Sequence, residues 1–323
     1  NHRIWVIWKV ENLMERSPFL SSKEIICSAD LLARALKFKK PNVVVANAGS
    51  ELPMKAAFEA TVADLITPIF VGDIIKINNE AHKLNWDISS FEAISADGEE
   101  NSAKIAAELC GFGHGDILMK GDLHSDVFMK ATLTKDSGLR TGRRLVHSFL
   151  ITHPSDKRPI LISDAAVNIK PSLVTRKEAT RFAVEIFHAL GHERPKVAFL
   201  SATETPISTM ESSLDAVTLS KWATAEIQDA DFSGPLALDL ILSSESARVK
   251  GLSKNRVAGN ADAIIVPDIV SGNAIFKSLV YLAGGCAAGI VNGAKVPILL
   301  TSRSDPAAAR IASIALATIL TNR

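Results

Sequence analysis

The chain has 323 residues, 47% of them hydrophobic, which is enough to bury a large core, and its length predicts two domains of roughly 100 to 200 residues each. Its 36 basic and 35 acidic residues leave a formal charge of +1, so no overall positive field favours nucleic acid or an anionic membrane. The three cysteines are odd in number and widely spaced, which argues against a disulfide framework or a zinc site and favours the reducing cytoplasm.

Short runs rich in Val, Ile and Leu, each bounded by turn residues, predict β-strands along the whole chain. Amphipathic segments between them predict crossover helices. This alternation predicts an α/β fold whose mostly parallel sheet is covered on both faces, and ligands of such sheets bind outside the carboxyl ends of strands. The predicted strands are 43–46, 68–71, 116–119, 145–152, 159–163, 197–200, 263–266 and 296–301, and the predicted helices include 54–65, 102–110, 127–133, 175–190 and 274–288.

A polar turn near the end of the chain is the most informative of the predicted strand ends. It holds Ser302, Arg303, Ser304 and Asp305, between a buried apolar run and a segment of helical periodicity at 307–320. Backbone N–H groups and the dipole of such a helix favour an anion, and an arginine adds a bidentate clamp for phosphate or carboxylate. The turn is therefore predicted to bind phosphate.

Several common motifs are missing from the sequence. No GxGxxG opens a helix after a strand, no Walker sequence occurs, and there is no HExxH, CxxC pair, GxSxG elbow or internal repeat. A nicotinamide Rossmann domain, a nucleotide kinase, a metalloprotease and a serine hydrolase therefore lack support.

The strand-end segments, taken in order, resemble the phosphate acetyltransferase and phosphate butyryltransferase family. The resemblance covers roughly residue 39 to the end, and its upstream segments look more like the butyryltransferase branch. The matching segments are KVAFLSATE, SGPLALDLILS, VAGNADAIIVPDIVSGNAIFKSLVYLAGGCAAGIVNGAKVPILLTSRSD and, upstream, DILMKGDLHSDVFMKATL, GLRTGRRLVHSF and PILISDAAVNI.

The resemblance implies reversible transfer of a short-chain acyl group, acetyl or butyryl, between coenzyme A and inorganic phosphate. It implies direct attack in a ternary complex without a metal or a tightly bound cofactor, in a homodimer. The implied fold has two three-layer α/β domains with mostly parallel sheets facing across a cleft, as in isocitrate and isopropylmalate dehydrogenases. The second domain, 152–297, would be inserted in the first, which comprises 1–151 and 298–323.

The resemblance matches Ser302 and Arg303 to the family's Ser-Arg pair, which with Ser304 would hold phosphate. Asn273 begins the helix that carries Lys277, and the i, i+4 spacing lets both face one pocket. Asn273 is the candidate donor to the oxyanion of a tetrahedral intermediate. Gly272 before it allows a close backbone approach.

Asp305 has two interpretations. In the acetyltransferase branch the acid implicated as base lies several residues into the helix, but the equivalent stretch here, 306–309, holds no carboxylate. Asp305 is the nearest substitute that could take the thiol proton. The alternative is that Asp305 caps the helix, with Pro306 in its first position.

Four further side chains at strand ends or on neighbouring helices are candidates for substrate binding. Lys120 ends a strand beside a glycine, and by the resemblance Lys130 lies near a family arginine that helps to hold phosphate. His124 can act as acid or base, although a lone histidine in an α/β protein is more often structural. Asp164 either lines the cleft or caps the turn that follows it.

Two other functions remain open at this level. One is a metal-dependent, NAD-linked decarboxylating dehydrogenase of related fold, which would need an aspartate cluster for Mg²⁺ or Mn²⁺. The other is a non-catalytic acyl-CoA binding module, an alternative that is supported by the lack of a carboxylate at 306–309.

Overall fold

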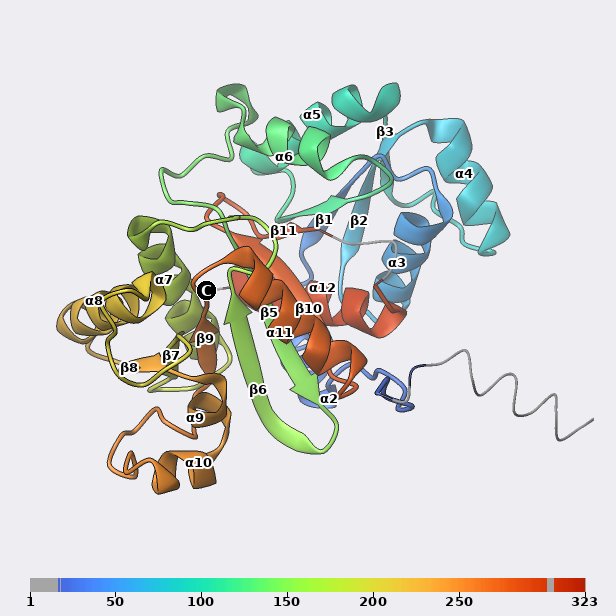
Figure 1. Cartoon of the computed structure of the whole chain (residues 1–323). Coiled ribbons are helices and arrows are strands. Elements are labelled where there is room, and N and C mark those ends of the chain that lie inside the picture. The colour runs from blue at the N-terminus through green and yellow to red at the C-terminus, as the bar shows by residue number, and fades with distance from the viewer. Residues whose placement is uncertain (1–16, 18, 301–304, 323) are drawn as a thin grey trace, which may run out of the picture.

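A computed structural model describes residue 17, residues 19–300 and residues 305–322 (Figure 1). One sheet runs through the molecule in the order β3-β2-β1-β4-β11-β10-β5-β6-β9-β7-β8. The strands are β1 Asn42–Ala46, β2 Thr67–Gly72, β3 Glu92–Ser95, β4 Ile117–Lys120, β5 Val146–His153, β6 Asp156–Ser163, β7 Lys196–Leu200, β8 Asp231–Leu236, β9 Ala263–Ile265, β10 Cys286–Asn292 and β11 Ile298–Leu299.

The sheet consists of two parallel blocks joined by antiparallel strands. The block from β3 to β11 is parallel, and so is the block from β6 to β8. β10 is antiparallel to both of its neighbours, and β5 is antiparallel to β6. The predicted mostly parallel α/β sheet is confirmed, but the two blocks run in opposite directions, so their carboxyl ends do not form a single row.

Helices cover the sheet. Several begin with a side-chain cap: Asp73 accepts from Ile75 N and Lys76 N, and Ser172 accepts from Thr175 N. The helices are α2 Ala29–Ala35, α3 Glu51–Val62, α4 Ile74–Lys83, α5 Gly98–Gly111, α6 Ser125–Leu133, α7 Leu173–Ala189, α8 Glu211–Glu226, α9 Leu238–Leu242, α10 Ser244–Val249, α11 Ile269–Tyr281 and α12 Ala307–Thr321, with a 3₁₀ turn η1 at Lys135–Ser137. No helix in the described part of the chain has the length and apolar character needed to cross a membrane.

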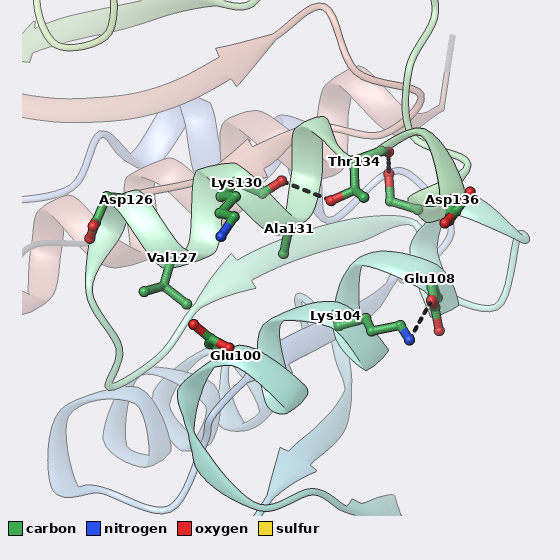
Figure 2. A pocket seen from close by; sticks show the side chains of 10 residues that line it. Glu100, Lys104, Glu108, Asp126, Val127, Lys130, Ala131, Thr134 and Asp136 are labelled. Atoms are coloured by element: carbon green, nitrogen blue, oxygen red, sulfur yellow. Dashed lines mark hydrogen bonds and ion pairs between the residues drawn. The ribbon is translucent and has the colours of Figure 1, made fainter.

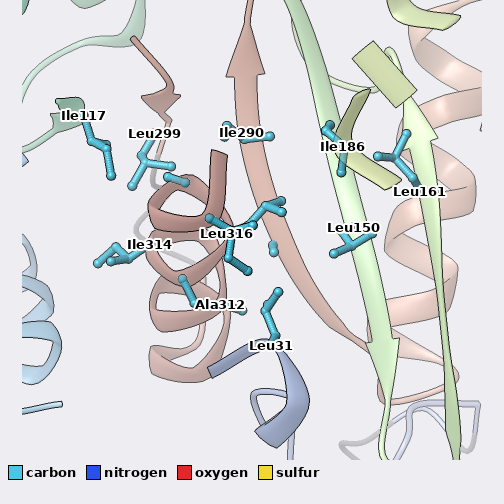
Figure 3. Close-up of a cluster of buried hydrophobic side chains, with 14 of the residues drawn as sticks. Leu31, Ile117, Leu150, Leu161, Ile186, Ile290, Leu299, Ala312, Ile314 and Leu316 are labelled. Carbon is cyan, nitrogen blue, oxygen red and sulfur yellow. The ribbon is translucent and has the colours of Figure 1, made fainter. Parts of the chain in front are cut away.

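The two faces of the sheet are packed differently. One face carries a continuous buried cluster that includes Leu150, Ile290 and Leu316 of α12 (Figure 3). On the other face the core is split: Val291 of β10 belongs to a cluster under α5 and α6, whereas Ala287 belongs to a cluster under α9 and α11. Since side chains alternate along a strand, the gap between the two clusters lies over Gly289.

The predicted helix 274–288 is wrong in its last part. α11 ends at Tyr281, and Cys286 begins β10. Gly284 adopts φ +79°, a conformation that terminates helices and that glycine reaches without steric cost. A Cβ on Gly285 would lie 2.8 Å from Ile151 Cγ2, so the chain enters β10 in close contact with β5.

Candidate active site

A pocket of about 310 Å³ lies over β5 and β10, in the gap between the two core clusters. It gathers three of the predicted site residues, Asn273 and Lys277 from α11 and Asp305 from the segment before α12. α11 lies on this face of the sheet, whereas α12 packs on the opposite face and its first turns reach the pocket past the end of β11. Figure 1 shows α11 in orange across β5 and β10.

The apolar part of the pocket is built from the alternation of two paired strands. Ala287 and Gly289 lie on one face of β10, and with Gly285 just before the strand they present almost no side chain to the pocket. Phe149 of β5 pairs with Gly289 and stacks on Phe276 of α11, with ring centroids 3.9 Å apart and planes 9° apart. Small residues on one strand therefore leave room beside an aromatic wall.

Gly289 is a position of this pocket where no side chain would fit. A Cβ there would lie 2.8 Å from Phe149 Cε1 and 3.2 Å from His147 Cε1, so both rings occupy the volume that a side chain would need. Because β11 ends at Leu299, the Gly289 N–H instead donates to Ser313 Oγ of α12, at 2.9 Å. This bond fixes the floor of the pocket to α12.

Gly272 sets the position of Asn273. A Cβ on Gly272 would lie 2.7 Å from the Asp164 carbonyl oxygen, so only glycine lets α11 approach the loop after β6 this closely. Asn273 Nδ2 donates to the Ala165 carbonyl at 3.4 Å, which leaves its second N–H for the pocket. Asp268 caps α11 by accepting from Ser271 N at 2.9 Å.

Asp164 organises that loop. Its buried carboxylate accepts from Ala166 N and Val167 N, both at 2.9 Å, and from His147 N at 3.2 Å. It also accepts from the backbone and side chain of Asn168. This geometry matches the turn-capping interpretation of Asp164, and the residue does not line the pocket.

Asp305 lies half-buried at the pocket, next to the start of α12. The N-cap position is occupied by Pro306 without a side-chain cap, so the alternative in which Asp305 caps α12 with Pro306 inside the helix is wrong. The guanidinium of Arg310, which is buried, donates to the Asp305 carbonyl oxygen and holds the segment against the helix. The predicted phosphate-binding residues Ser302, Arg303 and Ser304 lie outside the described residues.

Lys130 lies in a different pocket, of about 610 Å³, between α5 and α6 (Figure 2). Lys104 lies across from it on α5, 3.9 Å from Glu108. Four acidic side chains line this pocket against two lysines, which is not a setting that favours phosphate. The structure therefore does not bring Lys130 together with Asn273, Lys277 and Asp305.

Lys120 and His124 lie at the carboxyl end of β4 and the start of α6. Gly121 approaches β1 so closely that a Cβ would lie 2.2 Å from the Ala46 carbonyl oxygen. The exposed His124 ring bonds Glu99 at 2.8 Å, and the His124 N–H also donates to this carboxylate. These bonds, the backbone one foremost, lower the Glu99 pKa. Of this region only Ser125 lines the pocket under α11.

His147, Phe149, Phe276 and Ser313 line the pocket and were not predicted from the sequence. The polar His147 within the apolar run 145–152 was the available signal, whereas the other three look like ordinary core or helix residues. No group of three or more His, Cys, Asp or Glu side chains that could hold a metal ion occurs among the residues that the structure describes.

Comparison with known proteins places this chain in a family. Residues 99–318 match the family described as phosphate acetyl/butaryl transferase. A phosphate acetyltransferase from Rickettsia felis is 39% identical over 295 residues, covering 91% of this chain and 84% of that protein. A probable phosphate butyryltransferase from Bacillus subtilis is 36% identical over 289 residues, covering 89% and 96%.

Among solved structures, a branched-chain phosphotransacylase from Enterococcus faecalis superposes with a TM-score of 0.77 at 28% identity. The alignment covers 87% of this chain and 99% of that one. The relatives carry both acetyl and butyryl names at similar identity, so they do not separate the two branches. The chain belongs to the phosphate acetyl/butyryl transferase family.

Proposed function

We propose that the chain is a phosphate acyltransferase that moves a short acyl group, acetyl or butyryl, reversibly between coenzyme A and inorganic phosphate. The observation that carries the proposal is the pocket under α11, which joins an apolar floor to an amide, an ammonium and a carboxylate. It also lies where the chain leaves β11 toward the predicted phosphate turn 302–304. Family membership favours this function over a decarboxylating dehydrogenase.

The two parts of the pocket suit the two parts of an acyl thioester. The acyl chain would lie against Phe149, Phe276 and the small residues of β10, because these present apolar surface without hydrogen-bond demand. The carbonyl would face Asn273, whose free N–H can donate to the oxygen as it gains negative charge. Lys277 at the rim adds a positive charge for phosphate or coenzyme A.

The reaction needs a group that takes the proton of the coenzyme A thiol, because a thiol with a pKa of about 8.5 is mostly protonated at neutral pH. We assign this role to Asp305. The first turn of α12 holds no acidic residue, and Asp305 lies at the pocket without capping the helix. Ser302, Arg303 and Ser304 would hold the phosphate, and direct attack on the acyl carbon would follow in a ternary complex.

We also propose the two-domain division 1–151 with 298–323 and 152–297, with the domains facing across a cleft. Support comes from the return of the chain end: β11 pairs with β4, and α12 packs against α2 and α3. A homodimer in the cytoplasm follows from the resemblance, and three free cysteines fit a reducing compartment. Light scattering would test the dimer.

The test is phosphate-dependent release of free coenzyme A thiol from acetyl-, propionyl- and butyryl-CoA. We expect saturable release that depends on both substrates and needs no added metal. Arg303→Ala and Asp305→Asn should both abolish it. If Arg303→Ala abolishes thiol release and Asp305→Asn does not, Asp305 is not the group that takes the thiol proton. If the wild type binds acyl-CoA but releases no thiol, the chain is a binding module.

A further inference from the structure

His147 is a buried side chain of the pocket that the proposed chemistry has not yet used. Only 2% of its surface is exposed, yet the residue lines the pocket under α11. Its Nδ1 is buried with no hydrogen-bond partner, and Nε2 makes no hydrogen bond to any residue in the described ranges. A buried polar atom without a partner is costly and rare in native proteins, so this ring needs an explanation.

Backbone hydrogen bonds and ring packing hold the His147 ring in place, although its nitrogens have no partner among the described residues. The His147 N–H donates to Asp164 at 3.2 Å, and its carbonyl accepts from Ser163 Oγ at 2.9 Å. Phe149 packs against the imidazole with centroids 4.2 Å apart, and the missing side chain of Gly289 makes room for both rings. The orientation is therefore set by packing before any ligand arrives.

The imidazole is uncharged at neutral pH. Burial lowers the pKa of His147 from 6.5 to about 4, against the opposing effect of the nearby Asp164 carboxylate. Among the residues that the structure describes, the other charged groups lining the pocket are Lys277 on α11 and Asp305 before α12. A neutral imidazole has one N–H donor and one acceptor nitrogen, and it donates without carrying a charge.

We propose that His147 is a further catalytic residue, a neutral hydrogen-bond donor to the carbonyl oxygen of the bound acyl group. The inference rests on the proposed acyl transfer. Phosphate oxygen attacks the acyl carbon, the carbonyl π electrons move to oxygen, and the oxyanion accepts hydrogen bonds from His147 and Asn273. When the oxyanion collapses, the C–S bond breaks and coenzyme A leaves with the sulfur electrons.

No proton passes to or from His147 in this step. Such a weakly basic imidazole cannot take the proton of a thiol, because the transfer would be strongly uphill. A donor needs only to be fixed and neutral, and the packing against Phe149 and Gly289 provides that. Asp305 therefore remains the group that takes the proton of the coenzyme A thiol in the reverse direction.

The test compares His147→Leu, which removes the donor, with His147→Gln, which keeps a neutral one. His153→Leu is the matched control, because His153 lies on the same strand and its ring bonds backbone atoms outside this pocket. Steady-state phosphorolysis of propionyl-CoA gives kcat and KM, and thermal unfolding reports folding. A second measurement follows the imidazole ¹⁵N shifts of His147 in the wild type when propionyl-CoA is added.

For His147→Leu we expect kcat to fall by about 100- to 1,000-fold with KM changed by less than about 3-fold, since the interaction strengthens in the transition state. His147→Gln should keep kcat within about 10-fold of the wild type, and His153→Leu should leave it unchanged. Addition of propionyl-CoA should change the ¹⁵N chemical shift of a His147 ring nitrogen while the imidazole stays neutral.

The inference is overturned if His147→Leu keeps the wild-type kcat, or if Gln and Leu lower kcat equally in proportion to lost stability. Unchanged ¹⁵N shifts on addition of saturating propionyl-CoA would also overturn it, even if both variants fail to fold. A wild type without phosphate-dependent release overturns the proposed function itself, which distinguishes that failure from the failure of His147 alone.

Discussion

Substituting Gly289 should change which acyl chain the protein accepts. In Gly289→Ala the new Cβ would lie 2.8 Å from Phe149 Cε1, a separation that real Cβ atoms do not keep. Phe149 must therefore move, and since it lines the pocket and is stacked at 3.9 Å on Phe276, the new methyl group and the displaced ring take up space there. The substitution therefore shrinks the space proposed for the acyl chain.

The size of the effect can be estimated. Overpacking of a well-packed site costs about 1 to 3 kcal/mol, and one methylene of substrate in an apolar pocket is worth about the same. Butyryl has two methylenes more than acetyl. We therefore expect kcat/KM for butyryl-CoA to fall on the order of 10-fold or more relative to that for acetyl-CoA.

The assay is phosphorolysis of acetyl-, propionyl- and butyryl-CoA, compared as ratios of kcat/KM. Gly115→Ala is the control, because its Cβ would lie 2.3 Å from Val44 Cγ2 in the core and should lower stability without changing the ratios. If Gly289→Ala lowers all three values equally, or changes nothing, the acyl chain does not lie over Gly289.

Three other predictions concern buried groups. Arg176→Met should leave the free energy of unfolding unchanged or raise it, because Nε and Nη2 of this buried guanidinium lack partners among the described residues. Asp215→Ala should lower the free energy of unfolding by roughly 3 to 5 kcal/mol, because it removes the ion-pair partner that lies 3.1 Å from Arg176. Urea denaturation measures both effects. The unfolded chain takes up a proton at His147 near pH 6.5, whereas the folded chain does so only near pH 4. The free energy of unfolding should therefore fall as the pH drops through this window, by about 3 kcal/mol more in the wild type than in His147→Leu. Equal losses in both proteins would show that the His147 pKa is not depressed. Burial raises the pKa of Cys27 to about 11, and burial together with the nearby Cys27 raises the pKa of Cys286 to about 12. Iodoacetamide at pH 8 should therefore label both thiols far more slowly in the folded protein than in urea, and rapid labelling of the folded protein would refute this.

The buried parallel strands β1, β2, β4, β7 and β9 were predictable because their sequences carry a strong local signal, whereas the parallel strands β3 and β8, which are less buried, were not predicted. The run Val43–Ala46 is almost entirely β-branched and buried, and it became β1 with one additional residue. β10 was missed because its Ala and Gly residues have little preference for a strand, and it is the packing against β5 and α12 that makes it one. Its small residues are required by the pocket that they line.

The candidate site was partly predictable for the same kind of reason. Asn273 and Lys277 share one helix face, and that spacing alone brought them together. Lys130 lies on a helix whose start reaches the same pocket, but its side chain faces α5, and only the fold decides that direction. The polar His147 within an apolar run was a local signal, but His147 lies far from α11 in sequence, and only the packing of α11 on β5 places it at the pocket.

The most direct test of the active-site assignment compares two single substitutions in the phosphorolysis assay. Asn273→Ala removes the amide at the pocket under α11, and Lys130→Ala removes the lysine at the pocket between α5 and α6. We predict that Asn273→Ala lowers kcat by about 100-fold or more, whereas Lys130→Ala leaves kcat and the KM for phosphate at wild-type values. The opposite pattern, with Asn273→Ala fully active and Lys130→Ala impaired, would place the chemistry at the other pocket and contradict the account.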